Sequence, residues 1–180
     1  EKWDAYALLA ICIVALLFTL AFFSRIYSAI GNIFYSIWHG NSLERIDNNS
    51  SMSRSRNLAA LLFALLISMA ATNLYERIAG EELGIPDSLA CTAIFTGLLL
   101  IYFSKYLAFR IMDWVNSTNV FSLVNKIYLS YIIFLVVLLL PGIASLYLFD
   151  GMSMQSFKYY CAASSGIVFL MFVQKSYSLL

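Results

Sequence analysis

Charged residues are spaced along this chain so that five long stretches contain none, and each stretch is rich in apolar residues. The five stretches hold 20, 19, 17, 23 and 16 residues in chain order. A hydrocarbon core about 30 Å thick needs roughly 20 apolar residues of helix to cross it. The pattern therefore predicts five membrane-spanning segments, at residues 5–24, 57–75, 88–104, 127–149 and 159–174.

The periodicity within these stretches predicts helices rather than strands. Inside a bilayer every backbone N–H and C=O group must be satisfied within the protein, so spanning segments are helices or strands of closed barrels. Barrel strands alternate apolar and polar residues over about 10 residues, and these stretches do not alternate. We predict an all-α fold, with residues 1–180 forming one transmembrane domain that is a polytopic helix bundle. With flanking residues, its spans cover about 5–24, 57–75, 88–109, 124–149 and 159–174.

Two segments between the spans are amphipathic, and both fall on the same side of the predicted bundle. In residues 26–39, apolar residues recur at helical spacing on one face, while Ser28, Asn32 and Ser36 lie on the other. Residues 110–123 mix apolar and polar side chains in a similar way. We predict interfacial helices in both segments on the cytoplasmic side, packed against lipid or against the bundle. The polar run at residues 48–55 predicts a mobile loop.

Basic residues are divided unequally between the two sides of the membrane. If the segments between spans alternate sides, eight of the 11 Lys and Arg residues lie on one side and three on the other. Because cytoplasmic loops gather Lys and Arg, we predict the N-terminus outside the cytoplasm and the C-terminal residues inside. Lys105, at the end of the third stretch, is expected to reach the interface with its long side chain. The composition fits this class, since only 12% of residues are charged, against about 25% in soluble domains.

Small residues recur four positions apart on two of the predicted spans. Ala60, Ala64 and Ser68 form one such stripe on the second span. Ala93 and Gly97 form another on the third span. Small residues at this spacing let helix backbones approach closely, so we predict that both stripes are helix-packing or partner contacts.

Three further positions are candidates for packing or partner contacts. Pro141-Gly142 in the fourth span predicts a kink or a helix end. Gly166 lies in a run of small residues that predicts another close contact in the fifth span. Asn125 and Lys126 stand at the entry of the fourth span. Either they anchor the helix at the interface, or Asn125 hydrogen-bonds the preceding segment or a partner.

Residue types that carry catalysis or bind metals are sparse and scattered. His39 is the only histidine, and Asp113 and Asp150 are isolated from other acids. The three cysteines lack the spacing of a zinc or thioredoxin-like site. Because no set of groups converges as an active site requires, we predict no enzyme, no cofactor and no metal site. We expect no nucleic-acid partner.

Two motifs and the order of the segments resemble a known family. The motifs are FSLVNKI at residues 121–127, running into a long apolar helix, and NSLER at residues 41–45. Around them stand a span, an amphipathic cytoplasmic segment, two spans, and then two more spans. This arrangement resembles an uncharacterised family of polytopic inner-membrane proteins from Bacteroidota, a domain of unknown function. The resemblance implies a bacterial inner-membrane location, with the predicted N-terminus in the periplasm and the C-terminal residues in the cytoplasm.

These observations favour a non-enzymatic integral membrane subunit that packs beside membrane lipid and other membrane-protein subunits. We predict an accessory or structural subunit of a larger envelope complex. The most concrete candidate for that complex is a machine for protein export or membrane insertion. The alternative is a transporter or channel component for a small solute, because an oligomer could enclose a pore and Pro141-Gly142 could act as a hinge. The predicted spans lack the ionisable groups that transporters usually place there. A membrane-embedded enzyme is the weakest alternative.

Overall fold

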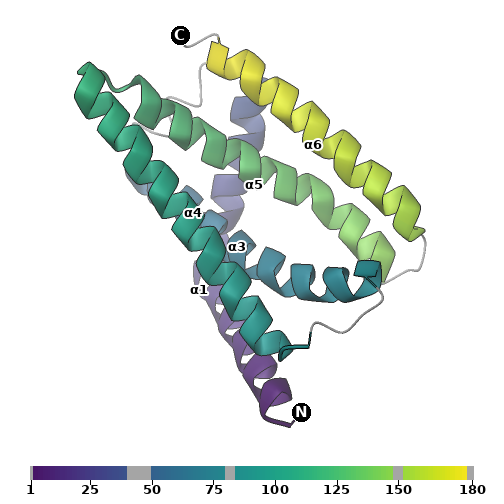
Figure 1. Cartoon of the computed structure of the whole chain (residues 1–180). Helices are drawn as coiled ribbons and strands as arrows, with labels where there is room; N and C mark the ends of the chain where they lie inside the picture. The colour runs from purple at the N-terminus through teal and green to yellow at the C-terminus, as the bar shows by residue number, and fades with distance from the viewer. Residues whose placement is uncertain (1, 40–49, 80–83, 148–151, 178–180) are drawn as a thin grey trace.

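The structure of the chain, a computed structural model, describes residues 2–39, 50–79, 84–147 and 152–177. Every regular element in these residues is an α-helix. The helices are α1 (Lys2–Trp38), α3 (Ser50–Ala79), α4 (Asp87–Asn116), α5 (Val120–Tyr147) and α6 (Met154–Tyr177). Figure 1 shows α4, α5 and α6 in front of α1 and α3, with α1 beginning at the bottom of the view and α6 ending at the top.

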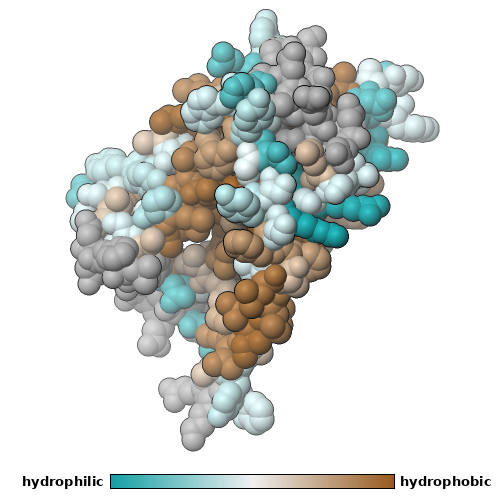
Figure 2. Space-filling model, turned by 180° about the vertical axis from the view of Figure 1, so that it is seen from behind, coloured by the Kyte–Doolittle hydropathy of each residue, from teal (hydrophilic) through white to brown (hydrophobic). Residues whose placement is uncertain are grey.

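All five helices in the described part are long and apolar enough to cross a membrane, which confirms the predicted all-α transmembrane bundle. α3 and α4 contain 30 residues each, so each is about 45 Å long and extends beyond a hydrocarbon core of roughly 30 Å. Figure 2 shows a broad apolar surface on the stem formed by the first half of α1, where Leu9, Leu16 and Leu20 are exposed. Such a surface suits contact with lipid or with another membrane helix.

α1 is a single helix from Lys2 to Trp38. The prediction that a span ends just before Arg25 and that a separate helix follows it is therefore wrong. Arginine favours helix, and a change from an apolar to an amphipathic pattern does not interrupt the backbone hydrogen bonds. The second half of α1 is therefore not a separate interfacial helix. Its residues Ile26, Ala29 and Ile33 are buried in the core of the bundle.

α3, α4 and α5 also extend beyond the predicted spans. α3 begins at Ser50, so most of the predicted loop at residues 48–55 is helical. The buried Ser55 hydroxyl donates to the Ser51 carbonyl at 3.0 Å, which satisfies the polar group inside the helix. The predicted interfacial element at residues 110–123 is likewise not a separate helix, because it consists of the end of α4, a turn and the start of α5. Residues 148 and 149 of the predicted fourth span lie outside the described residues.

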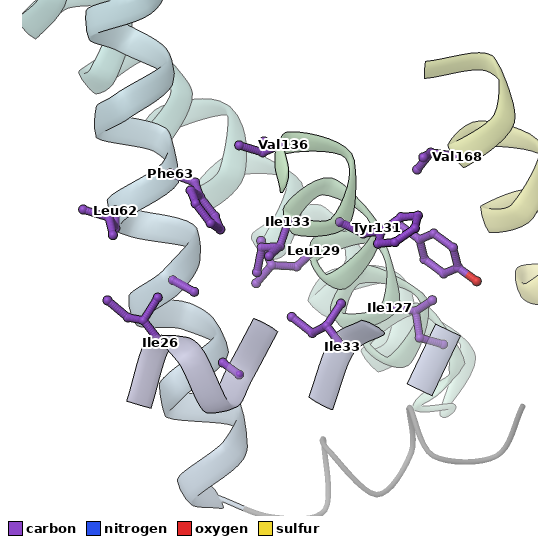
Figure 3. Close-up of a cluster of buried hydrophobic side chains, with 13 residues drawn as sticks. Ile26, Ile33, Leu62, Phe63, Ile127, Leu129, Tyr131, Ile133, Val136 and Val168 are labelled. Carbon is purple, nitrogen blue, oxygen red and sulfur yellow. The ribbon is translucent and has the colours of Figure 1, made fainter. Parts of the chain in front are cut away.

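The apolar core is centred on α5, and α1, α3 and α6 pack around it (Figure 3). Side chains of α5 face Leu62 and Phe63 of α3 on one side and Val168 of α6 on the other. The rings of Phe34 on α1 and Phe134 on α5 meet edge to face, with centroids 4.8 Å apart. The core residues are Ile26, Ala29, Ile33, Ala59, Leu62, Phe63, Ile127, Leu129, Tyr131, Ile133, Phe134, Val136 and Val168.

The turn between α4 and α5 is organised by Asp113, which the sequence presented as an isolated acid. Its carboxylate accepts hydrogen bonds from the backbone N–H groups of Phe121 at 2.9 Å and Ser122 at 2.7 Å. It therefore caps the N-terminus of α5 from the end of the preceding helix. Ser117 adopts the left-handed conformation, with φ 53° and ψ 38°. The Thr118 N–H donates to the Asp113 carbonyl at 3.0 Å and closes α4.

Polar and aromatic contacts attach the rest of α4. Asp4, in the first turn of α1, accepts a hydrogen bond from the Ser88 N–H at 3.0 Å, so the two helices begin at the same end of the molecule. The side chain of Lys105, which was expected to reach the membrane interface, contacts aromatic rings of the bundle. Its Nζ lies 2.9 Å from the centre of the Tyr128 ring on α5, which is a cation–π contact. α4 continues well beyond this lysine, to Asn116.

Candidate functional site

The predicted contact face of α4 lines an open groove between α1 and α4, which we call the lateral groove. Its volume is about 780 Å³. Most of its surface is apolar, and the hydroxyl of Thr92 is satisfied within α4, since it donates to the Ser88 carbonyl at 2.7 Å. The lining residues are Ala7, Ala10, Ile11, Ser88, Leu89, Thr92, Ala93, Thr96, Gly97 and Leu100.

Ala93 and Gly97 were predicted to be helix-packing or partner contacts, and the structure places both residues on the wall of the lateral groove. A Cβ atom added at Gly97 would meet no atom within 4 Å, and Ala93 is exposed. The two helices are held together at one end of the groove by the bond between Asp4 and Ser88. The small residues of α4 therefore leave the lateral groove open on its α4 side. Among the described residues they do not bring two helices together.

The small-residue stripe of α3 has a different surrounding. Ser68 is fully buried, and its hydroxyl donates to the Ala64 carbonyl at 2.7 Å. Ala60 packs against the core cluster and is partly buried. A serine hydroxyl bonded to the preceding turn leaves no polar group for a ligand. This stripe is thus used inside the bundle and is not an open surface.

Pro141 and Gly142 join α5 to α6, and α5 does not end at the proline. A Cβ atom added at Gly142 would lie 2.6 Å from the ring of Tyr160 on α6, closer than any real contact. The Tyr160 hydroxyl donates to the carbonyl of Leu138, in the turn that precedes Pro141. Proline removes the backbone donor that the carbonyl four residues earlier, at Val137, would accept from, and the Tyr160 hydroxyl bonds the next carbonyl along the helix. The pair therefore positions α6.

Gly166 was also predicted to make a close contact, and the structure contradicts this within the chain. Gly166 lies on α6, is exposed, and a Cβ atom added there would meet nothing within 4 Å. Its neighbour Ile167 is 58% exposed. The exposed surface around Gly166 combines small residues such as Ala162 and Ala163 with large ones such as Leu170.

The motif pair Asn125-Lys126 divides into a buried and an exposed residue. Lys126 is exposed, whereas Asn125 is only 4% exposed. Among the described residues no hydrogen-bond partner reaches the Asn125 Oδ1 atom. The predicted bond from Asn125 to the preceding segment is therefore absent in this part of the chain. A buried amide oxygen without a donor costs about 1–3 kcal/mol, so Asn125 is a residue whose partner remains to be found.

Titratable groups do not gather into a reactive centre in the part of the chain that the structure describes. No group of three or more His, Cys, Asp or Glu side chains that could hold a metal ion occurs in those residues. The cysteines Cys12, Cys91 and Cys161 are all free thiols. The features that stand out are the lateral groove, the buried Asn125 and a polar cavity beside α3.

The chain forms long apolar helices that follow one another in sequence and pack around a core centred on α5. These features define a multi-pass helical membrane protein. Residues 5–180 match the model of a family described as a domain of unknown function, DUF4271, and the chain belongs to that family. The match covers all five helices. No curated protein and no solved structure matches the chain.

Proposed function

We propose that this protein is an accessory subunit of a larger membrane complex, and that its lateral groove receives a transmembrane helix of a partner protein. The observation that carries this proposal is the position of Ala93 and Gly97 on an open apolar groove, with no helix of this chain against Gly97. Membrane helices associate through small residues that let backbones approach closely, because apolar burial gives little drive in lipid. The groove offers such a surface.

The attachment of α4 supports the same function. Among the described residues the core cluster around α5 includes none from α4, whose buried apolar residues Ala90 and Cys91 lie outside that cluster. The large side chains Leu100, Ile101 and Phe103 of α4 are more than 60% exposed. A partner helix seated in the groove would contact the small residues and be flanked by these larger ones.

Photo-crosslinking in native membranes tests the groove. A benzophenone amino acid at Thr96, which lines the groove, is expected to give a discrete higher-mass adduct that mass spectrometry identifies as one membrane protein. The same probe at Ile167, on the exposed face of α6, is the matched control and should give diffuse lipid adducts. Equal patterns at the two positions would contradict the proposal.

Copurification in mild detergent provides the second test. Gly97→Phe should fill the groove and reduce recovery of the crosslinked partner at least severalfold. Gly166→Phe is the control, because a Cβ atom at Gly166 likewise meets nothing within 4 Å. Both variants should retain the wild-type thermal stability. Full recovery of the partner with Gly97→Phe would exclude the groove as its binding site.

The proposed location is the bacterial inner membrane, with the N-terminus in the periplasm. The eight-to-three division of Lys and Arg supports this orientation, and the resemblance to inner-membrane proteins of Bacteroidota supports the location. After the native cysteines are replaced, a single cysteine at Ser117 should be shielded from an impermeant thiol reagent applied from the periplasmic side. A cysteine at Ser153 should react. The reverse labelling pattern would invert the proposed topology.

A further inference from the structure

A polar cavity of about 180 Å³ lies between the second half of α1 and the first turns of α3. Its inner wall includes the buried side chains of Ile33, Ser55 and Arg56, and its mouth includes the exposed Ser28 and Ser51. The described lining residues are Ser28, Ala29, Asn32, Ile33, Ser51, Met52, Ser55 and Arg56.

Arg56 gives the cavity its charge. The residue is 3% exposed, and a guanidinium stays protonated in proteins. One of its amino groups donates to the Ser53 hydroxyl at 3.4 Å. A guanidinium carries five N–H donors in a planar fork, so it can bind an anion in addition to its contacts within the protein.

The other lining groups add donors around the same space. Ser28 and Ser51 contribute hydroxyl groups, and Asn32 contributes an amide whose NH2 donates to the Ser28 hydroxyl at 3.4 Å. The Ser55 hydroxyl already donates to the Ser51 carbonyl at 3.0 Å. The cavity also lies against the first two turns of α3, which begins at Ser50. The positive end of a helix dipole favours a negative charge there.

We propose that this cavity binds a phosphate group. Arginine pairs with phosphate through two parallel hydrogen bonds, and hydroxyl and amide donors can serve the remaining oxygens. Arg56 lies six residues after the start of α3, about 9 Å along the helix axis, a depth at which the phosphate of a lipid headgroup can reach it. Dissolved phosphate offers the same chemistry from the aqueous side.

Binding to the whole protein, purified in a maltoside detergent without phospholipid, tests the site. The two probes are inorganic phosphate and a short-chain phosphatidic acid, each titrated at constant ionic strength and followed by calorimetry. Wild-type protein should bind at least one probe. Binding of phosphatidic acid alone identifies a lipid headgroup as the source, and binding of both shows that dissolved phosphate also enters.

Arg56→Gln should weaken this binding about tenfold or more, because a hydrogen bond to a charged group is lost. Arg54→Gln is the matched control, since Arg54 is exposed on the same helix, and it should bind as the wild type does. If Arg56→Gln fails to fold, Asn32→Leu at the partly exposed wall decides, with a loss of about threefold or more expected. Absence of binding to both probes, or unchanged affinity in the folded variants, would overturn the proposal.

Discussion

α5 and α4 are both long apolar helices of one bundle, yet different kinds of contact hold them. α5 supplies six of the core residues, and 44% of its most apolar window is buried, against 11% for α4. α4 is attached near its start by Asp4, in its second half by Lys105 over Tyr128, and at its end by Asp113. α5 is held mainly by the core that surrounds it, whereas α4 combines packing at the buried Ala90 and Cys91 with these directional contacts.

The difference shows how little hydropathy alone says about position in a membrane bundle. In lipid the apolar side chains of both helices are solvated about equally well by neighbours and by acyl chains. Shape and hydrogen bonding therefore decide which helix lies in the centre. A helix held at a few points also leaves most of its surface available to a partner, which agrees with the open groove beside α4.

The largest expected effect comes from removing core volume on α5. Ile133 is 1% exposed, so Ile133→Ala should lower the free energy of unfolding by roughly 2–5 kcal/mol, because the side chain leaves a cavity. Ile101→Ala on α4 is the matched change, since Ile101 is 66% exposed, and its effect should stay within about 0.5 kcal/mol. Thermal unfolding in detergent measures both. Equal losses would remove the contrast between the two helices.

Adding volume on α5 should have the next largest effect. Gly142→Leu forces the Tyr160 ring away from α5, because a Cβ atom alone would lie 2.6 Å from it, and overpacking costs about 1–3 kcal/mol. Gly97→Leu on α4 is the control with open space around the residue, and it should keep wild-type stability. The double variant Gly142→Leu with Tyr160→Ala should recover part of the loss. An unaffected Gly142→Leu protein would show that α6 can separate from α5 at no cost.

A smaller effect is expected when the polar attachment of α4 is cut at its end. Asp113→Ala leaves the N–H groups of Phe121 and Ser122 without their acceptor, so the melting temperature should fall, but less than with Gly142→Leu. Asp113→Asn should show a smaller fall, because its single amide oxygen can still accept from one of the two N–H groups that bond Oδ1 and Oδ2. Amide hydrogen exchange should show the loss at the start of α5. Exchange that is unchanged there would mean that another group caps this helix.

The smallest effect on stability is expected at Asn125, the polar residue inside α5. Because its Oδ1 atom has no donor among the described residues, Asn125→Leu should change the free energy of unfolding by less than about 0.5 kcal/mol or raise it. Copurification should nevertheless lose any partner that bonds this amide. A clear drop in stability would instead mean that Asn125 is already paired inside the folded chain.

The sequence was sufficient for the number and type of the spans, because a run of about 20 uncharged apolar residues has one stable form in lipid. It was not sufficient for their ends. Arg25 and Lys105 interrupt the apolar runs, yet the helices continue through them. The polar run before Arg56 predicted a loop, but Ser55 and Arg56 are buried in helix α3 beside α1, and this tertiary contact has no local signal.

The candidate site was predictable only in part for the same reason. The spacing of Ala93 and Gly97 singled out a face of α4 that lines the lateral groove, but a stripe of small residues does not state whether its neighbour is in the same chain. The role of Asp113 was not predicted because the backbone N–H donors that its carboxylate accepts from lie eight and nine residues away, across a turn. A cap of that kind depends on the turn geometry and not on a fixed sequence spacing.

The bond between Asp4 and Ser88 can form only after much of the chain has been synthesised. The two residues are 84 positions apart, so α1 and α3 leave the ribosome before the donor for the Asp4 carboxylate has been made. α1 therefore enters the membrane with its first turn unattached, and the arrival of α4 completes that end of the bundle. A chain stopped before Ser88 would lack the backbone donor for this carboxylate.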